Sequence, residues 1–160
     1  MSQFDKIQAL NQSILGAELD DAECAVLADR MGEVALTDGE TLVTEGEARQ
    51  TLFLLGAGKI DVIRNQGGSD VHLHRMRAGE CAGTRAFVDG SDRKAALRAV
   101  GDARVLTLEP IDFESLLDDH PRIVYKVMRA IFRITHANLM RMNQESAELK
   151  NYLVRAPGRY

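Results

Sequence analysis

Cysteine is scarce in this sequence, which contains only Cys24 and Cys81 among 160 residues. Two widely separated thiols match neither a disulfide framework nor the paired spacing of a zinc site, so we expect a reduced compartment with inert thiols. No stretch approaches the length of an apolar membrane span, and the N-terminal residues lack the basic and then apolar pattern of a secretory signal. These absences predict a cytoplasmic protein that does not associate with membranes.

A set of side chains for catalysis is also missing. Cys81 lies next to Glu80, but no histidine follows it in the context of a catalytic triad. No acid, base and nucleophile come together elsewhere in the sequence. We therefore expect no enzymatic activity and no catalytic cofactor.

Histidines are few, and two of them need separate treatment. His72 and His74 stand two positions apart on a predicted strand, so both side chains face the same way and could bind a metal. No later histidine falls on a strand that could complete the ligand set. An exposed hairpin without a metal is the favoured interpretation.

The composition is otherwise that of an ordinary globular domain, with 45% hydrophobic and 28% charged residues. Its charge is uneven: residues 1–119 hold 12 Lys or Arg and 22 Asp or Glu, whereas residues 120–160 hold 8 and 2. A basic C-terminal region of this kind can bind nucleic acid. We favour the alternative that a basic helix rests against its own acidic domain, and we expect no specific DNA binding.

Helices and then short strands follow one another in the first part of the chain. The apolar spacing around Leu10 predicts a short helix, and Asp20 begins a second one that runs to Met31. From Glu33 the apolar period becomes that of strands, which glycine-rich turns separate. Strands are expected at 34–36, 41–43, 52–55, 60–63, 71–73 and 104–108. This pattern predicts a mainly β fold of the roll, barrel or sandwich class with N-terminal helices.

A long helix is predicted towards the C-terminal end. Pro110 starts a short helix, and the pair His120 and Pro121 breaks it before the long helix at about 122–149. Apolar residues recur at threes and fours along this helix and give more apolar surface than one line of contact needs. The surplus predicts a homodimer formed through residues 122–142, and an unknown protein partner is also expected.

One stretch between two predicted strands carries the strongest functional signal. A strand-like segment ends at Gly79, a turn of small residues leads into one helical turn, and a loop delivers Arg93 to the next strand. Backbone N–H groups at Gly83 and Thr84 favour an anion, and a guanidinium can close over the same oxygens. This arrangement predicts a site for one small phosphate ester.

Residues 79–99 resemble the phosphate-binding cassette of the cyclic nucleotide-binding domain family. That family reads Gly-acidic-x-Phe-Gly-Glu-x-Ala-Leu, then a variable loop, then Pro-Arg-x-Ala-x-Val-x-Ala. The matching positions are Gly79, Glu80, Gly83, Ala86, Phe87, Arg93, Ala95, Leu97 and Ala99. The resemblance covers about residues 33–142. It implies a jelly-roll-like β-roll, or double-stranded β-helix, whose long C-terminal helix both dimerises and closes over the nucleotide base.

The resemblance also implies which residues bind the ligand. They are Ala82, Gly83, Thr84, Arg85, Arg93, Lys94 and Ala95 in the cassette, and Asn138 on the long helix, where a polar side chain reaches the base. The implied ligand is cyclic AMP or another cyclic nucleotide. Three positions depart from the family: Ala82 replaces Phe, Asp92 replaces Pro, and Thr84 replaces the Glu that accepts hydrogen bonds from the ribose 2′-OH.

Two functions are compatible with these residues. Arg93 favours a regulatory sensor that binds a cyclic nucleotide and signals through its long helix. Thr84 favours a degenerate, nucleotide-independent β-roll that acts as a dimeric interaction or structural subunit. Residues 150–160 are too few for the winged helix-turn-helix of the family's transcription factors. We therefore expect a sensor without its DNA-reading half, made of an N-terminal helical segment (1–32), the β-roll (33–109), the hinge and dimerisation helices (110–149) and a tail.

Overall fold

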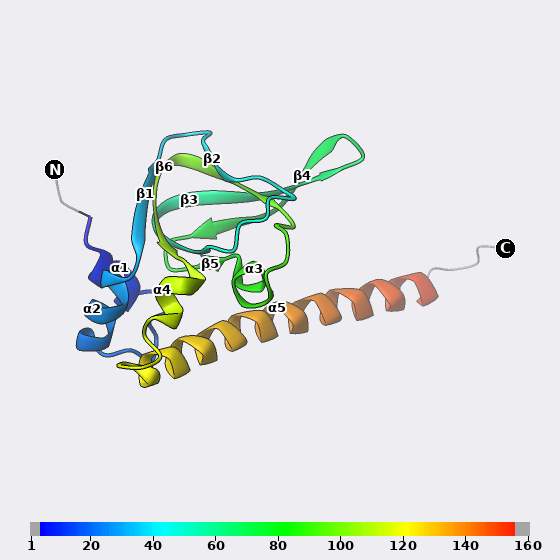
Figure 1. Ribbon diagram of the computed structural model, residues 1–160. Helices are drawn as coiled ribbons and strands as arrows, with labels where there is room; N and C mark the ends of the chain where they lie inside the picture. The colour runs from blue at the N-terminus through cyan, green and yellow to red at the C-terminus, as the bar shows by residue number, and fades with distance from the viewer. Residues whose placement is uncertain (1–3, 156–160) are drawn as a thin grey trace.

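The computed structural model describes residues 4–155, and six antiparallel strands form its centre. The strands are β1 (Gly32–Leu36), β2 (Thr41–Val43), β3 (Leu52–Gln66), β4 (Ser69–Arg77), β5 (Cys81–Ala82) and β6 (Ala96–Leu108). The main path is β1-β6-β3-β4, with β2 paired to β6 and β5 paired to β3. Figure 1 shows how the long strands β3 and β6 curl to form a roll.

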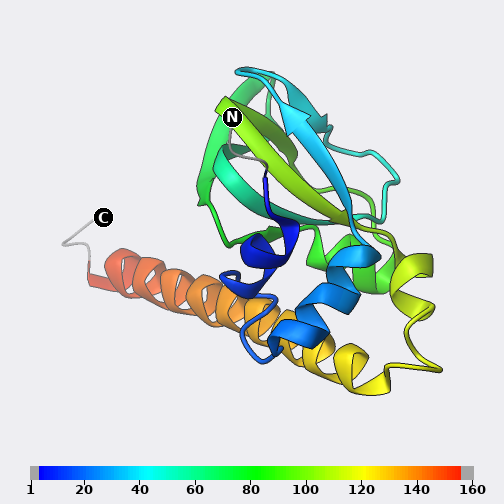
Figure 2. The same ribbon diagram turned by 90° about the vertical axis from the view of Figure 1, so that its left-hand side faces the viewer.

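Five helices flank the roll in the part of the chain that the structure describes. They are α1 (Lys6–Asn11), α2 (Asp21–Asp29), α3 (Thr84–Asp89), α4 (Pro110–Glu114) and α5 (Pro121–Arg155). Helices α1, α2 and α4 gather around the start of α5, which then runs beneath the roll and past it (Figure 1, Figure 2). The predicted fold class, a mainly β roll with N-terminal helices and a long C-terminal helix, is confirmed.

One of the expected turns is a bend inside a continuous strand. We predicted separate strands at 52–55 and 60–63, but β3 runs through both, with shifts of its register against β6 around Ala57. Gly58 has φ of +90°, and a Cβ there would lie 2.3 Å from the carbonyl oxygen of Asp102. A glycine at this position therefore bends a strand that stays paired, as a β-bulge does, instead of ending it. The prediction of a strand break was wrong.

The alternating side chains of β3 divide the interior into two apolar clusters. Leu52 and Leu54 point towards the helices, whereas Phe53 and Leu55 point into the roll, and all four are at most 1% exposed. Strand β6 follows the same alternation beside it. Since successive side chains of a strand point to opposite faces, this part of β3 is covered on both sides.

Helix α5 packs on the helical cluster only along its first half. Five apolar side chains of this half are buried: Ile123, Val127, Ala130, Ile131 and Ile134. Basic side chains beside them pair with the N-terminal segment: Lys126 Nζ lies 2.6 Å from Glu23 Oε1, and Arg133 Nη2 lies 3.0 Å from Glu18 Oε1. The basic end of the chain thus rests in part against its own acidic residues, as expected.

Candidate functional site

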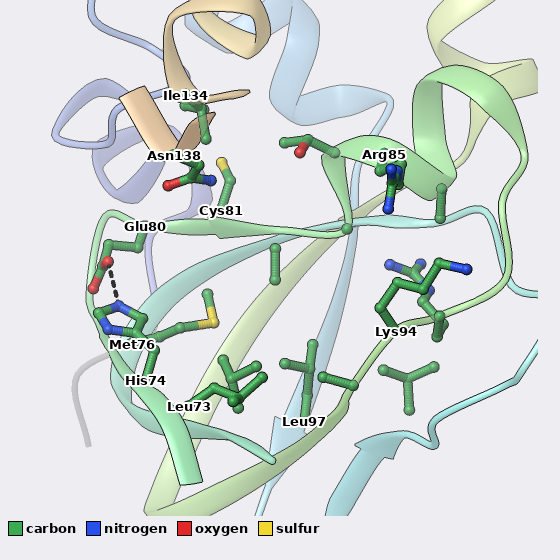
Figure 3. A pocket seen from close by; sticks show the side chains of 18 of the residues that line it. Leu73, His74, Met76, Glu80, Cys81, Arg85, Lys94, Leu97, Ile134 and Asn138 are labelled. Carbon is green, nitrogen blue, oxygen red and sulfur yellow. Dashed lines mark hydrogen bonds and ion pairs between the residues drawn. The ribbon is translucent and has the colours of Figure 1, made fainter. Parts of the chain in front are cut away.

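A cavity of about 470 Å³ lies between the roll and α5. Its walls come from β4, β5, the start of α3, the loop before β6 and the middle of α5 (Figure 3). All eight residues that we predicted to bind the ligand line this cavity. The fold therefore brings the predicted residues of the cassette and of the long helix together around one space.

Gly83 shapes the wall at the point where β5 becomes α3. Ala82 ends β5 in a pair with Phe53, and Gly83 follows as the N-cap of α3 with φ of +84°. A Cβ at Gly83 would lie 1.9 Å from Nη1 of Arg93 and 3.0 Å from the carbonyl oxygen of Thr51. Only glycine combines the left-handed backbone with this close approach. The absence of a side chain at Gly83 therefore leaves the space that the Arg93 guanidinium group occupies.

Arg93 is the most deeply placed charged group of the cavity, with an exposed fraction of only 5%. Its Nη2 donates a hydrogen bond to the carbonyl oxygen of Thr51, and its guanidinium lies 4.9 Å from the ring centroid of Phe53. Its Nε is buried without a hydrogen-bond partner among the described residues. Burial, and secondarily the charge of Arg49, lowers the pKa of Arg93. A buried cation with an unused donor is an incomplete arrangement that an anion would complete.

A supporting layer behind Arg93 was not found from the sequence. Thr51 is fully buried, and its hydroxyl donates to Oε1 of Glu109 at 2.6 Å. The backbone of Arg93 is held by Glu47, whose carbonyl oxygen accepts from the Arg93 N–H at 3.0 Å. Arg49 lies 5.1 Å from the centroid of the Phe53 ring. The contacts of Thr51 with Glu109 and of Glu47 with Arg93 join segments far apart in the sequence, so no local motif indicates them.

Polar and cationic side chains form the rim near Arg93. Thr84 and Arg85 begin α3, whereas Lys94 and Ala95 stand in the loop before β6. Arg85 and Lys94 are exposed, and Figure 3 shows both at the same end of the cavity. This end therefore presents several positive charges around one space.

The opposite end of the cavity is formed by β4, the start of β5 and α5. His74 Nε2 lies 2.9 Å from Glu80 Oε1, and the other oxygen of Glu80 accepts from the N–H of Arg77 at 2.5 Å. Asn138 lies at this end on α5 (Figure 3). Burial raises the pKa of Cys81 to about 12, so its thiol stays protonated and unreactive at neutral pH.

The two histidines of β4 do not share a ligand set. The register of β3 against β4 shifts between Val62 and Ile63, whose partners are His74 and His72. This bulge places His72 beside Asp61, with 2.8 Å between Nε2 and Oδ1, while His74 pairs with Glu80. Within residues 4–155, no group of three His, Cys, Asp or Glu side chains is placed to hold a metal.

No helix in the described part of the chain is long and apolar enough to cross a membrane.

Comparison with known proteins shows similarity to one protein family. The family described as cyclic nucleotide-binding domain matches residues 33–120. A cAMP-dependent protein kinase regulatory subunit from Blastocladiella emersonii is 27% identical over 109 residues, which are 68% of this chain and 27% of that protein. The chain spans less than half the length of the curated relatives that it matches.

Solved structures give the same result for the fold. The catabolite activator protein of Thermus thermophilus superposes with a TM-score of 0.78 and 24% identity, over 86% of this chain and 63% of that one. The N-terminal domain of a transcriptional regulator from Streptomyces coelicolor A3(2) superposes with a TM-score of 0.74 and 28% identity. That match covers 84% of this chain and 94% of the other.

Proposed function

Because the chain belongs to the cyclic nucleotide-binding domain family, we propose that it is a regulatory module that binds a cyclic nucleotide or a related phosphate ester in this cavity. Relatives named for cyclic AMP support a ligand of this class. The phosphate would lie against Arg93 and the start of α3, and the base would lie towards Asn138. We further propose that α5 transmits the bound state to a partner.

The observation that carries this proposal is the state of Arg93. Its guanidinium is almost completely buried at the cavity, yet Nε has no partner in the described part of the chain. Burying a charged group whose donors are not all paired costs free energy, and a phosphate that approaches the guanidinium group from the cavity would recover part of it. A structural arginine would instead pair most of its donors with the protein's own oxygens, whereas the Arg93 side chain makes one hydrogen bond within the described residues, from Nη2 to the carbonyl oxygen of Thr51.

The position of α5 supports its role in transmission. Ile134, Asn138 and Arg141 line the cavity, so a bound ligand would touch the helix directly. The side chain of Ile134 is buried in the protein, whereas the side chains of Asn138 and Arg141 are exposed. A ligand would therefore add contacts to the first part of α5 that lies outside the apolar core, and this would bias its position.

We also propose that α5 forms a homodimer, through a stripe that its own fold leaves uncovered. The stripe consists of apolar residues that lie three, four or seven positions apart: Tyr125, Met128, Phe132, Leu139 and Met142, which are 39–66% exposed. The same spacing continues to Leu149 and Leu153, which are 60% and 64% exposed. An apolar seam of this period is typical of helix pairing, and an uncovered patch of this kind favours association.

Calorimetric titration tests the ligand proposal. We expect cyclic AMP or cyclic GMP to bind at micromolar affinity or weaker, and Arg93→Ala to abolish binding of every phosphate ligand. Arg98→Ala is the matched control, because Arg98 is exposed on β6 and does not line the cavity. Thermal unfolding checks that the Arg93 variant is folded, and Arg93→Lys, which keeps the charge, serves if it is not. Unchanged binding in the Arg93 variants would contradict the proposal.

A second variant tests the departure at position 84. Thr84→Glu restores the carboxylate that the family uses for the ribose 2′-OH, so it should strengthen cyclic AMP binding by about 10-fold or more. The same variant should not help 2′-deoxy cyclic AMP. Val88→Glu adds the same charge to α3 outside the cavity and is the control.

The alternative function is a nucleotide-independent roll that acts only through its dimer. Thr84 is the observation that favours it, because a hydroxyl replaces only part of the interaction that a carboxylate makes with a ribose. This alternative predicts no heat of binding with any nucleotide. It also predicts that Phe132→Asp, which disrupts the exposed stripe, abolishes the function while Arg93→Ala leaves it intact.

A further inference from the structure

The rim beside Arg93 carries more positive charge than one cyclic phosphate would neutralise. Three cations line this end of the cavity, Arg85, Arg93 and Lys94, and Asp92 is the carboxylate that lines it with them. A cyclic mononucleotide brings a single negative charge. Glu47 and Glu109, whose charges act on Arg93, do not line the cavity. Among the residues that line this end, the cations would therefore remain in excess after such a ligand had bound.

The two exposed cations of the rim, Arg85 and Lys94, form no ion pair with the described residues of the protein. None of the ion pairs in residues 4–155 involves Arg85 or Lys94. Asp89 lies near both, but it does not line the cavity, and its carboxylate accepts hydrogen bonds from the N–H and hydroxyl of Ser91. Arg85 and Lys94 are thus available to a ligand together with the guanidinium group of Arg93, which lines the same cavity.

From this convergence, and resting on the proposed function of the cavity, we infer that the preferred ligand is a nucleotide that carries two separate phosphate groups. One phosphate lies against Arg93 and Gly83. The second lies at the rim between Thr84 and the cations Arg85 and Lys94.

The residue at position 84 decides whether a second phosphate is tolerated. A glutamate there would repel it, whereas the Thr84 hydroxyl is neutral and can donate a hydrogen bond to a phosphate oxygen. Arg85 follows directly and offers a planar set of donors that suits phosphate oxygens. The substitution that weakens recognition of a ribose hydroxyl is therefore the same one that admits a second anion.

Calorimetry with ligands that share one base and one sugar tests the inference. The probes are cyclic AMP, adenosine 3′,5′-bisphosphate and adenosine 2′,5′-bisphosphate, each titrated into the wild type, Thr84→Glu, Arg85→Gln and Arg98→Gln at two salt concentrations. Arg98→Gln removes one positive charge near the cassette but outside the cavity, so it measures the general electrostatic effect. Arg93→Ala is titrated in parallel to test the cavity itself.

We expect at least one bisphosphate to bind about 10-fold or more tightly than cyclic AMP, with a steeper loss of affinity in salt. Arg85→Gln should weaken the bisphosphate about 10-fold and change cyclic AMP little. Thr84→Glu should act in opposite directions, strengthening cyclic AMP and weakening the bisphosphate.

Two other results have distinct meanings. If cyclic AMP binds as tightly as either bisphosphate and depends on Arg93, the inference is overturned and the proposed function stands. If none of the three ligands binds the wild type, or if binding does not depend on Arg93, the proposed function fails and the inference with it.

Discussion

The two halves of α5 both carry apolar residues at helical spacing, but their surroundings are opposite. From Pro121 to Thr135 buried and exposed residues alternate, and four of the five buried ones, Ile123, Val127, Ala130 and Ile131, belong to the apolar cluster of the N-terminal helices. From His136 to Val154 every residue is exposed, including Leu139, Leu149 and Tyr152. Apolar residues at helical spacing occur in both halves. The difference teaches that apolar residues at helical spacing predict a packing contact. They do not distinguish a contact within the chain from a contact with another protein.

The cavity lies at the boundary between these halves. Ile134 is the last buried residue of α5 in the described part of the chain, and Asn138 lies one turn further on, where the helix is already exposed. Both line the cavity. A ligand there would therefore contact the helix where the support of the apolar core ends.

The largest expected effect separates two neighbouring residues of the first half. Ile131 is 2% exposed and Phe132 is 66% exposed. Ile131→Asp buries an unpaired carboxylate and should lower the free energy of unfolding by about 3–5 kcal/mol. Phe132→Asp should leave a folded protomer. Urea denaturation followed by circular dichroism measures both, and equal losses in the two variants would contradict this division of the helix.

The second effect concerns association and not folding. Phe132→Asp should raise the dissociation constant of the proposed dimer about 100-fold, because an exposed aromatic ring of the seam is replaced by a charge. Sedimentation at several protein concentrations measures this change. Met140→Asp is the control, since Met140 is also exposed but lies off the stripe. A wild-type protein that stays monomeric at micromolar concentration would contradict the proposal of a dimer.

A smaller effect is expected at the boundary between the halves. Asn138→Ala removes one polar contact with the proposed ligand and should weaken nucleotide binding about 3–10-fold, which is the range of one net hydrogen bond. Stability should not change, because Asn138 is exposed. Asn143→Ala, further along the same helix and outside the cavity, is the matched control for calorimetry. Equal affinities in both variants would place the base away from α5.

The smallest effect concerns the ion pairs that tie the first half to the N-terminal segment. The hydrogen bond from Arg133, together with the charges of Arg129, Arg133 and Lys126, lowers the pKa of the Glu18 carboxyl. Since the pKa is lower in the folded state, the stabilisation is present above the pKa of the unfolded chain and is lost as pH falls through the folded value. The wild type should therefore exceed Glu18→Gln in Tm at pH 7 and lose this advantage in acid.

Glu145→Gln controls for the loss of one carboxylate, because Glu145 is exposed in the second half of α5. A difference between the wild type and Glu18→Gln that persisted unchanged to pH 2 would contradict the assignment to this ion pair.

The features that could be predicted from the sequence are local ones. The residues of the cassette follow one another within a short stretch. Their order alone therefore predicts a turn, the start of a helix and an arginine that lies near both. Asp20 was correctly assigned to the start of α2, where it forms a capping box with Glu23. The roll itself follows from short apolar periods with glycines between them. The prediction of a strand break at Gly56–Gly58 was wrong because glycine favours both a β-bulge and a turn, and the local sequence does not distinguish them.

The supporting contacts of the site could not be predicted in this way. Arg93 donates to a carbonyl 42 residues before it, and the hydroxyl of Thr51 donates to a carboxylate 58 residues after it. Thr51 and Glu109 are ordinary polar residues in their local sequence. They become important only because β3 and β6 pair side by side. A contact of this kind depends on the register of the sheet, which no short pattern contains.

By itself, the sequence determined that this chain forms a β-roll with a glycine turn that leads into a short helix, and a long amphipathic helix, because these depend on local spacing and on backbone preferences. Only the tertiary structure decided that Arg93 is buried with an unused donor, that Arg85 and Lys94 line the same cavity, and which stripe of α5 stays exposed. These properties depend on which distant segments cover one another. Burial and proximity arise from packing, and packing is set by the whole chain at once.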